Sequence, residues 1–463
     1  MDWKSRARVV LLHGIYDAFF TLALLVASPY LLYRIVTSGR FRAGLGQRFG
    51  FIPRRRAPQR PCLWIHGVSV GETKTAEALI EELQRRHPDV EIVLSTTTAT
   101  GQKVARRRYP ERTIFYYPLD FSLVAHRVLR RIRPDAILLM ELEIWPNFLL
   151  ACALRDIPVA VVNGRISQRS FEGYRRIRRI LPEPFGRVAL YCVQTQDYAD
   201  RLLALEVDRS KIFITGNMKY DNLQTEAAWA SRDSLQGAFG VKPTDRVLIG
   251  GSTHPGEEEV LVGTYKRLRR QAKDLRLVLV PRHPQRAPEV RQIIEKQGLR
   301  AVSKTQLDSG QVRARGDEVV LVDTVGDLAV VYALGTLVFV GGSLIPHGGQ
   351  NMLEPAALGK PVLFGPHTFN FSEDVAILLE QHAAIQVQDR ADLSAQVARL
   401  LTDPDSARSM GERAQAVLRE RKGATTRIAD LLESHLGHRF GAGRNGTGVE
   451  AESHPASTAL TRH

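Results

Sequence analysis

Cysteine is scarce in this sequence, which contains only Cys62, Cys152 and Cys192. The three lie far apart and form no C-x-x-C motif. This spacing argues against a disulfide framework and against a cysteine-based zinc site, and it suits a protein of a reducing compartment.

Paired histidines are also lacking. The 13 histidines include no H-x-x-x-H spacing, and His254, His283, His347 and His367 each stand alone in a predicted loop. A single loop histidine is better explained as an ordinary polar residue than as a metal ligand. We therefore predict that the protein needs no metal.

Acidic residues are outnumbered: 49 Asp and Glu stand against 64 Lys and Arg, for a formal net charge of +15. Such a surface attracts anions, so nucleic acid, anionic lipid and phosphorylated substrates are all conceivable partners. The basic stretches contain no stacking-aromatic motif, which argues against nucleic acid.

Long apolar runs are missing except near the N-terminus, where residues 18–33 carry no charge. This segment is shorter than the roughly 20 residues of a comfortable membrane span. It lacks a clear cleavage site, so a retained anchor is favoured over a removed signal peptide. More basic residues follow it than precede it, which predicts a cytoplasmic main body. Spanning the bilayer and lying in its interface remain equally open.

Apolar runs alternate with helical patterns through the rest of the chain, which predicts an α/β fold of two Rossmann-like domains with parallel sheets. The interdomain cleft of such a fold is a usual place for a small-molecule site. In the first half the expected strands are residues 63–66, 91–95, 112–117, 136–140, 158–162, 189–194 and 212–215. In the second half they lie within the segments RVLIGGST, LRLVLVPRHP, EVVLVDTVGD, TLVFVGGSL and KPVLFGPH.

The predicted organisation has four parts: a membrane-anchoring helix at 1–36, domains at 37–235 and 236–436, and a disordered polar tail at 437–463. Because both domains begin after the anchor, we expect the anchor to be separable from the fold.

The stretch HGVSVGETKTAEALIEEL, residues 66–83, leads from a predicted strand into an amphipathic helix. Ser69 and Glu72 form an S-x-x-E pair, so Glu72 could simply complete a capping box. The same loop also lies at the carboxyl end of a parallel strand, where open α/β sheets place their ligands. The window alone leaves both interpretations open.

Two further motifs end strands of the first half. In ELEIWPN, Glu141 and Glu143 are two residues apart and share one face. Buried strand-end carboxylates are costly unless paired or used, although both could be solvated edge residues. In GNMKYD, Lys219 could pair with an anion or simply face solvent.

Glycine-rich loops follow the strands of the second half, in GGSTHPGEEE, VPRHPQR and DTVGDLAVVY. Glycines let the backbone approach a ligand, and the helices that follow favour phosphate binding. Arg282 could bind phosphate directly. In GGQNMLEPAALGKPV, Asn351 and Glu354 stand at a helix start, where Glu354 could accept hydrogen bonds from a ribose.

In order, SVGE, ELEIWPN, GNMKYD, PRHP, VGDL and GGQNMLEPAALGKPV closely resemble the 3-deoxy-D-manno-octulosonic acid (Kdo) transferase family of lipopolysaccharide assembly, over residues 31–432. The resemblance implies a glycosyltransferase B fold and inverting transfer of Kdo from CMP-Kdo to the lipid A precursor, lipid IVA. It further implies work at the cytoplasmic face of the inner membrane, with no cofactor or metal.

Carried onto this chain, the resemblance makes Glu72 the proton acceptor and Glu141 and Lys219 stabilisers of the transition state. Glu143 could share the role of Glu141. The implied contacts to CMP are Pro281, Arg282, Val325, Gly326, Asp327, Asn351, Met352, Leu353 and Glu354.

Two alternatives share parts of this pattern. Another two-domain glycosyltransferase or a sugar-nucleotide epimerase with a UDP donor would have the same fold. A membrane-tethered anion binder would share the basic surface. The motifs SVGE and ELEIWPN, together with the anchor, favour the Kdo transferase interpretation.

Overall fold

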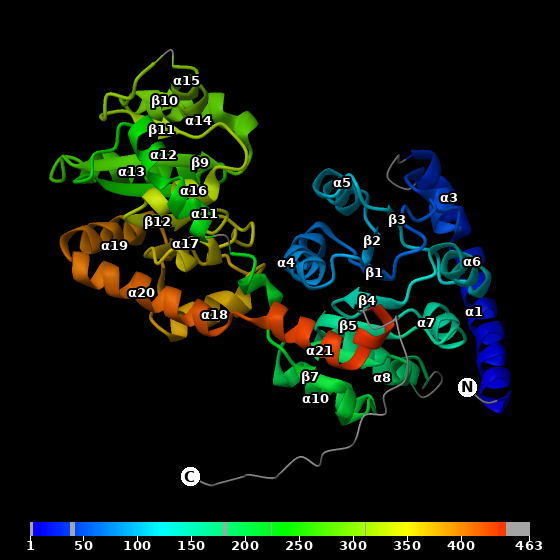
Figure 1. Cartoon of the computed structure of the whole chain (residues 1–463). Helices are drawn as coiled ribbons and strands as arrows, with labels where there is room; N and C mark the ends of the chain where they lie inside the picture. Colours follow the sequence, from blue (N-terminus) through cyan, green and yellow to red (C-terminus); the bar gives the residue numbers. More distant parts are fainter. Residues whose placement is uncertain (1–2, 38–41, 179–182, 224, 311, 441–463) are drawn as a thin grey trace, which may run out of the picture. The chain divides into compact units, whose positions relative to one another are not determined.

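The computed structural model describes residues 3–37, 42–178, 183–223, 225–310 and 312–440. The chain forms two compact units, each an α/β body (Figure 1). The first unit comprises the chain up to Met218 together with the chain from Gly423 onward, and the second comprises Lys219–Lys422.

A seven-stranded parallel sheet forms the centre of the first unit, in the order β3-β2-β1-β4-β5-β6-β7. The order reverses between β1 and β4, which is the switch point where doubly wound sheets bind ligands. All seven strands predicted for this half are confirmed, as β1 (Cys62–His66), β2 (Glu91–Thr96), β3 (Ile114–Tyr116), β4 (Ala136–Met140), β5 (Val159–Gly164), β6 (Leu190–Val193) and β7 (Ile212–Ile214).

Helices cover both faces of this sheet, because its strands are apolar on both sides. One face packs on α6 (Ser122–Ile132), α7 (Pro146–Ala153), α9 (Glu183–Gly186) and α10 (Gln196–Ala204). The other face packs on α4 (Val70–Arg86), α5 (Ala99–Arg108) and α21 (Ala424–Phe440). The short α3 (Leu45–Arg48) precedes the sheet, and α8 (Gln168–Arg178) follows β5.

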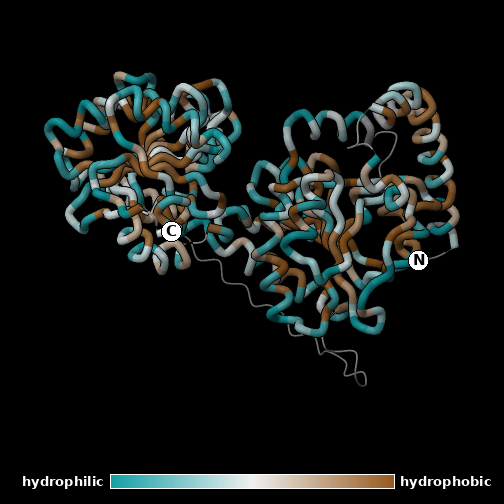
Figure 2. Tube along the Cα trace, turned by 90° about the horizontal axis from the view of Figure 1, so that it is seen from above, coloured by the Kyte–Doolittle hydropathy of each residue, from teal (hydrophilic) through white to brown (hydrophobic). Residues whose placement is uncertain are grey.

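The second unit repeats the architecture with the strand order β10-β11-β9-β8-β12-β13-β14, all parallel, and its order reverses between β8 and β12. Figure 2 shows hydrophobic residues gathered along the central strands of each unit. The strands are β8 (Arg246–Thr253), β9 (Leu275–Pro281), β10 (Ala301–Ser303), β11 (Val319–Leu321), β12 (Leu337–Val340), β13 (Val362–Phe364) and β14 (Ala384–Gln386).

Two of these strands, β10 and β14, were not predicted from the sequence. Each has three residues and lies at an edge of the sheet, so its apolar pattern is too short to stand out. The helices of the second unit are α11 (Thr225–Ala230), α12 (Arg232–Ala238), α13 (Glu257–Leu268), α14 (Ala287–Lys296), α15 (Lys304–Asp308), α16 (Leu328–Leu334), α17 (Leu353–Ala357), α18 (Ser372–Glu380), α19 (Arg390–Thr402) and α20 (Pro404–Glu420).

The unit boundaries differ from those predicted. Residues 219–235, expected in the first domain, fold with the second unit, where Ala228 packs in the same core as Val331. Helix α21 belongs to the first unit, because Ile428 and Leu432 are buried with Leu79 of α4. This helix reaches Phe440, so the predicted tail does not begin at 437. Residues 441–463 lie outside the described part of the chain.

The N-terminal helix α1 (Trp3–Thr37) packs against the first unit and is part of it, so it is not a separate domain (Figure 1). That the rest of the chain folds without it stays a prediction. Val9 and Tyr16 are buried in a small cluster with Leu150 of α7. By length and composition, the stretch Arg6–Tyr30 of this helix could cross a membrane. The helix therefore has an apolar composition suited to a membrane, while one of its faces packs against the rest of the first unit.

Candidate active site

Glu72 lies just beyond β1, at the switch point of the first sheet. The hydroxyl of Ser69, the N-cap residue of α4, accepts a hydrogen bond from the backbone N–H of Glu72 at 3.3 Å, which confirms the predicted cap. The Glu72 carboxylate accepts from the backbone N–H of Val68 at 2.8 Å and from the Ser69 hydroxyl at 2.9 Å. These contacts orient the carboxylate, and since each carboxylate oxygen has two lone pairs, each retains one for a further donor.

Glu141 follows β4, the strand on the other side of the switch point. Its backbone has φ of 58°, a left-handed conformation that is uncommon for a residue other than glycine. Its carboxylate accepts from Nε of Arg165 at 2.9 Å. Burial raises the pKa of Glu141, the Arg165 guanidinium lowers it, and the negative charge of Glu72 raises it. The Glu72 and Glu141 carboxylates thus lie within electrostatic range of each other.

Glu143 joins these two carboxylates. Its Oε2 accepts from the indole N–H of Trp145 at 2.9 Å. Burial raises the pKa of Glu143 to about 7, the Trp145 hydrogen bond opposes the shift, and the charges of Glu72 and Glu141 add to it. Glu141 and Glu143 are both partly buried, and each accepts a hydrogen bond from a neighbouring side chain. Because the charge of Glu72 raises the pKa of Glu141, and the charges of Glu72 and Glu141 raise that of Glu143, we call these three residues the acidic cluster.

A row of aromatic rings, formed by His66, Tyr117 and Trp145, lies beside this cluster and was not predicted from the sequence. The ring of Tyr117 lies 6.0 Å from that of Trp145 and stacks at 3.9 Å on His66, the last residue of β1. Burial lowers the pKa of His66 to about 3. The neutral, buried imidazole thus serves as packing next to the loop that carries Glu72.

Lys219 is found in the second unit rather than the first. Its Nζ lies 2.8 Å from Oδ1 of Asp374 in α18, and the hydroxyl of Tyr220 donates to the same oxygen at 3.1 Å. Lys219 is thus fixed by a buried carboxylate instead of facing solvent freely. Asp374 was not singled out from the sequence because no motif marks it.

The switch point of the second unit is organised by Glu257, which is fully buried. Its carboxylate accepts from the backbone N–H groups of His254 at 2.9 Å, Gly342 at 2.7 Å, Ser343 at 3.0 Å and Leu344 at 3.0 Å. It therefore ties the loop after β8 to the loop after β12. The sequence pointed to this loop for its glycines and gave no signal for the carboxylate.

The residues predicted to contact CMP all lie in the second unit. Pro281 ends β9, and the backbone N–H of Arg282 donates to the carbonyl of Thr253 at 3.0 Å. Val325 is 88% exposed, and Gly326 has φ of 106° with open space around the position of a Cβ. Asp327 is the N-cap residue of α16 and accepts from the Thr324 hydroxyl.

The predicted contacts around α17 divide into two kinds. Asn351 accepts from the backbone N–H of Leu353 at 3.1 Å and donates to Glu354 at 3.0 Å. The side chains of Met352 and Leu353 are buried in the core of the second unit. Only backbone atoms of these two residues are therefore available to a ligand.

Two glycines of the motif GGST have a packing role in place of the predicted ligand role. A Cβ at Gly250 would overlap Leu261, and one at Gly251 would overlap the Tyr332 ring. The protein's own side chains fill the space that these glycines leave. Gly326 remains a position where a ligand can approach the backbone.

Three histidines predicted to stand apart are brought together. The His254 ring lies 4.1 Å from that of His347 and 6.0 Å from that of His283. The pKa of His254 is lowered to about 4, chiefly by burial and then by the charges of His347 and His283. Among the described residues, no group of three or more His, Cys, Asp or Glu side chains is arranged to hold a metal ion.

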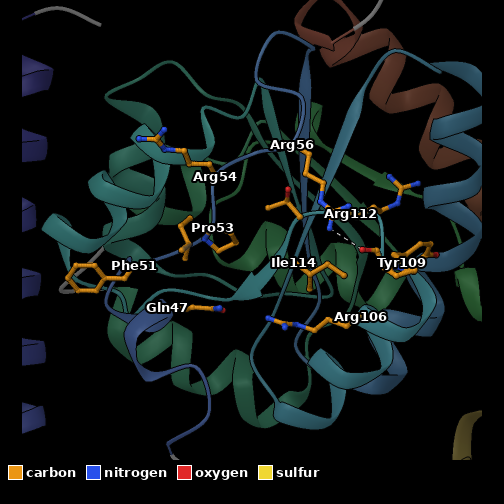
Figure 3. Close-up of a pocket in the computed structure, with 12 residues that line it drawn as sticks. Gln47, Phe51, Pro53, Arg54, Arg56, Arg106, Tyr109, Arg112 and Ile114 are labelled. Carbon is orange, nitrogen blue, oxygen red and sulfur yellow. Dashed lines mark hydrogen bonds between the residues drawn. The ribbon is translucent and has the colours of Figure 1, made fainter.

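A separate basic groove of about 660 Å³ lies in the first unit (Figure 3). None of its 12 lining residues is acidic, and four are arginines, Arg54, Arg56, Arg106 and Arg112. The groove begins where β3 begins, at the amino end of the sheet, whereas Glu72 follows the carboxyl end of β1. It is therefore distinct from the acidic cluster.

Two doubly wound parallel units in succession, with polar groups at both switch points, define a glycosyltransferase B fold. The UDP-GlcNAc 2-epimerase of Neisseria meningitidis has this fold, with a TM-score of 0.53, 17% identity, and coverage of 81% of this chain and 100% of that one. A glycosyltransferase of Rickettsia africae has a TM-score of 0.50 and 12% identity, covering 82% of this chain and 99% of that one. At these identities the likeness shows the fold alone.

Sequence comparison defines the family. The family model of 3-deoxy-D-manno-octulosonic-acid transferase matches residues 43–222. The enzyme of that name from Haemophilus influenzae is 34% identical over 424 residues, covering 90% of this chain and 98% of the relative. That from Bordetella pertussis is 32% identical and covers 90% of this chain and 99% of the relative. The chain belongs to the 3-deoxy-D-manno-octulosonic acid transferase family and is a glycosyltransferase of lipopolysaccharide biosynthesis.

Proposed function

We propose that the protein transfers Kdo from CMP-Kdo to the lipid A precursor with inversion at the anomeric carbon. The observation that supports this most directly is the acidic cluster of Glu72, Glu141 and Glu143 at the switch point of the first sheet. Such a cluster offers a carboxylate base beside others that favour positive charge. The names of the relatives support Kdo as the sugar.

Glu72 is assigned as the general base. As the acceptor hydroxyl oxygen attacks the anomeric carbon, its proton passes to a Glu72 oxygen, and the bond between that carbon and the CMP phosphate oxygen breaks with its electron pair leaving on CMP. The hydrogen bonds from Val68 and Ser69 fix the carboxylate before the reaction. Positioning of this kind supplies much of the rate where the base itself is weak.

Glu141 and Lys219 are assigned to the transition state. Glu141 stabilises the positive charge that develops at the anomeric carbon as CMP departs. Glu143, whose charge interacts with that of Glu141, is assigned a share in that role. Lys219 stabilises negative charge as a compact cation, and its ion pair with Asp374 orients the ammonium group.

Donor binding is assigned to the second unit. Arg282 pairs with the phosphate, the backbone at Gly326 leaves room for the nucleotide, and Glu354 accepts from the ribose. Glu257 holds the two loops at the switch point in place for this ligand. We assign no metal to the reaction, because cationic side chains and backbone N–H groups suffice for one phosphate.

We assign α1 to the inner-membrane surface, with the catalytic units in the cytoplasm. One face of the helix is packed on the first unit, while Leu11, Ile15 and Phe19 on another face are exposed. A helix with one face docked along a polar domain is suited to lying in the bilayer interface. The arginines of the basic groove would then meet lipid phosphates.

Mass spectrometry of the lipid product tests the donor and the acceptor together. The full-length protein, incubated with CMP-Kdo and lipid IVA in detergent, should add the mass of one or more Kdo units. The activity should survive EDTA. An unmodified lipid, together with turnover of a UDP-sugar, would support the epimerase or UDP-dependent alternative instead.

A further inference from the structure

Asn147 is a fully buried polar residue that the proposed chemistry does not use. Its Oδ1 accepts from Nδ1 of His13 at 2.8 Å. Its Nδ2 donates to Oδ1 of Asp17 at 2.8 Å and to the carbonyl of Asp120 at 2.7 Å. The amide therefore uses both of its donor hydrogens and joins α1 to the loop before α6.

The carboxylates of Asp120 and Asp17 add further hydrogen bonds between α1, the loop before α6 and the start of α7. Asp120 accepts from the backbone N–H of Asn147 at 3.1 Å and from that of Phe148 at 2.8 Å. Asp17 accepts from the backbone N–H of Ser122 at 2.9 Å and from its hydroxyl. We call His13, Asp17, Asp120, Ser122 and Asn147 the Asn147 junction. Its hydrogen bonds satisfy backbone donors at the start of α7, where the N-cap residue Trp145 provides no side-chain cap.

Residues 141–145 connect β4 to α7 without helix or strand. This segment carries Glu141 and Glu143, and Glu141 has the unfavourable φ of 58°. Such a conformation persists only where the surroundings over-determine it. One end of the segment is held by the sheet and the other by the start of α7. The second restraint is the Asn147 junction, two of whose members belong to the membrane helix.

We propose that α1 is a positioning element of the active site, in addition to an anchor: through the Asn147 junction it holds the segment 141–145 in its reactive conformation. This inference rests on the proposed function, because it takes Glu141 as a group that acts in transfer. The chemistry of the contact explains its placement on α1. A lone histidine and a lone aspartate in an apolar helix are costly unless they are paired.

The test uses the full-length protein with acceptor dispersed in detergent, where membrane targeting no longer affects the rate. Asp17→Ala removes the acceptor for Asn147 and Ser122, and we expect kcat to fall about tenfold with the KM for CMP-Kdo unchanged. Asp17→Asn retains an acceptor oxygen for Asn147 and should restore most of the activity. Asp89→Ala, which removes an exposed aspartate of the same unit, should behave as wild type.

Hydrogen exchange supplies a readout that does not depend on turnover. In Asp17→Ala the amides of residues 141–148 should exchange at least about tenfold faster, while those of residues 246–256 should not change. His13→Ala is a milder lesion, should show the same changes to a smaller degree, and serves if Asp17→Ala fails to fold.

Wild-type exchange and kcat in folded Asp17→Ala or His13→Ala would overturn the inference. Faster exchange with unchanged kcat would also overturn it, because the junction would then restrain the segment without serving catalysis. Failure of the proposed function would show differently, as undiminished transfer by Glu72→Gln in the same assay.

Discussion

Glu72 and Glu257 occupy equivalent places in the two units, yet they differ in burial and in their hydrogen-bond partners. Each lies in the first turn of the helix that follows the first strand of its unit, and each accepts from a backbone N–H of the loop before it. Glu257 is fully buried and takes three further N–H groups from the loop after β12. Glu72 is partly exposed, and its neighbours across the switch point are carboxylates.

The difference teaches that topology places a carboxylate at a switch point, whereas unsatisfied hydrogen-bonding capacity decides what it can do. A carboxylate surrounded by four N–H donors has become part of the backbone framework. A carboxylate with spare lone pairs, partial exposure and acidic neighbours can accept a proton from a substrate. The same substitution at the two positions should therefore have different consequences.

The largest effect is expected from Glu72→Gln. Loss of a general base typically lowers the rate by 10²–10⁴-fold, and we expect kcat to fall within about that range. Gln retains an oxygen acceptor for Val68, so the melting temperature and the affinity for CMP should stay near wild type. Turnover close to wild type, measured by product mass spectrometry, would reduce Glu72 to the capping role and remove the contrast with Glu257.

Glu257→Gln should instead act on stability. One side-chain oxygen would become an N–H₂ group facing backbone donors, which leaves buried N–H groups without acceptors and costs about 3 kcal/mol. Denaturant unfolding should show a less stable second unit, and calorimetric titration should show weaker CMP binding. If the variant were as stable as wild type but had lost only kcat, Glu257 would be a reactive group like Glu72.

How far the sequence predicted this molecule depends on how local each signal is. All strands except β10 and β14 lie in apolar runs, and Ser69 and Glu72 form a local motif, so these features were predicted. The role of Glu257 depends on the loop after β12, which lies far along the chain. Asp374, Asn147 and the grouping of three histidines likewise depend on tertiary contacts that no spacing reveals.

The boundaries show the same limit. Helix α21 packs on the first sheet although it follows the whole second unit in sequence, and α1 docks through buried hydrogen bonds that its apolar composition conceals. A hydropathy pattern predicts that one face of a helix will be buried, but it does not predict which sheet that face will pack against.

The acidic cluster should also make stability depend on pH. Burial raises the folded-state pKa of Glu143 from 4.5 to about 7, so the folded state binds more protons between these values. Stability from this group is present at low pH and is lost as pH rises through about 7. The Glu143→Gln variant has no ionisable group at this position. The difference in free energy of unfolding between the variant and wild type should therefore be more favourable to the variant at pH 8 than at pH 4.5, by about 1 kcal/mol when partial exposure is allowed for.

Urea unfolding at the two pH values measures this difference. If the stability difference between the variant and wild type were the same at pH 4.5 and pH 8, Glu143 would ionise as easily in the folded as in the unfolded protein. The acidic cluster would then lack the raised pKa that sets it apart from the switch point of the second unit.

The last prediction concerns the basic groove, and it tests whether the first unit contacts the bilayer. Arg54 and Arg106 line the groove from two different segments, and both are exposed. A basic residue near an anionic surface contributes about 1 kcal/mol, so replacing both by Gln should weaken binding to anionic vesicles by roughly 10-fold or more at low salt. High salt should reduce the difference, because exposed charges are screened.

The matched control replaces Arg267 and Arg270, exposed arginines of the second unit, and changes the net charge equally. An equal loss of vesicle binding in both double variants would show that net charge matters and the groove does not. A loss confined to the groove variant would mean that the unit carrying α1 also supplies the phosphate contacts.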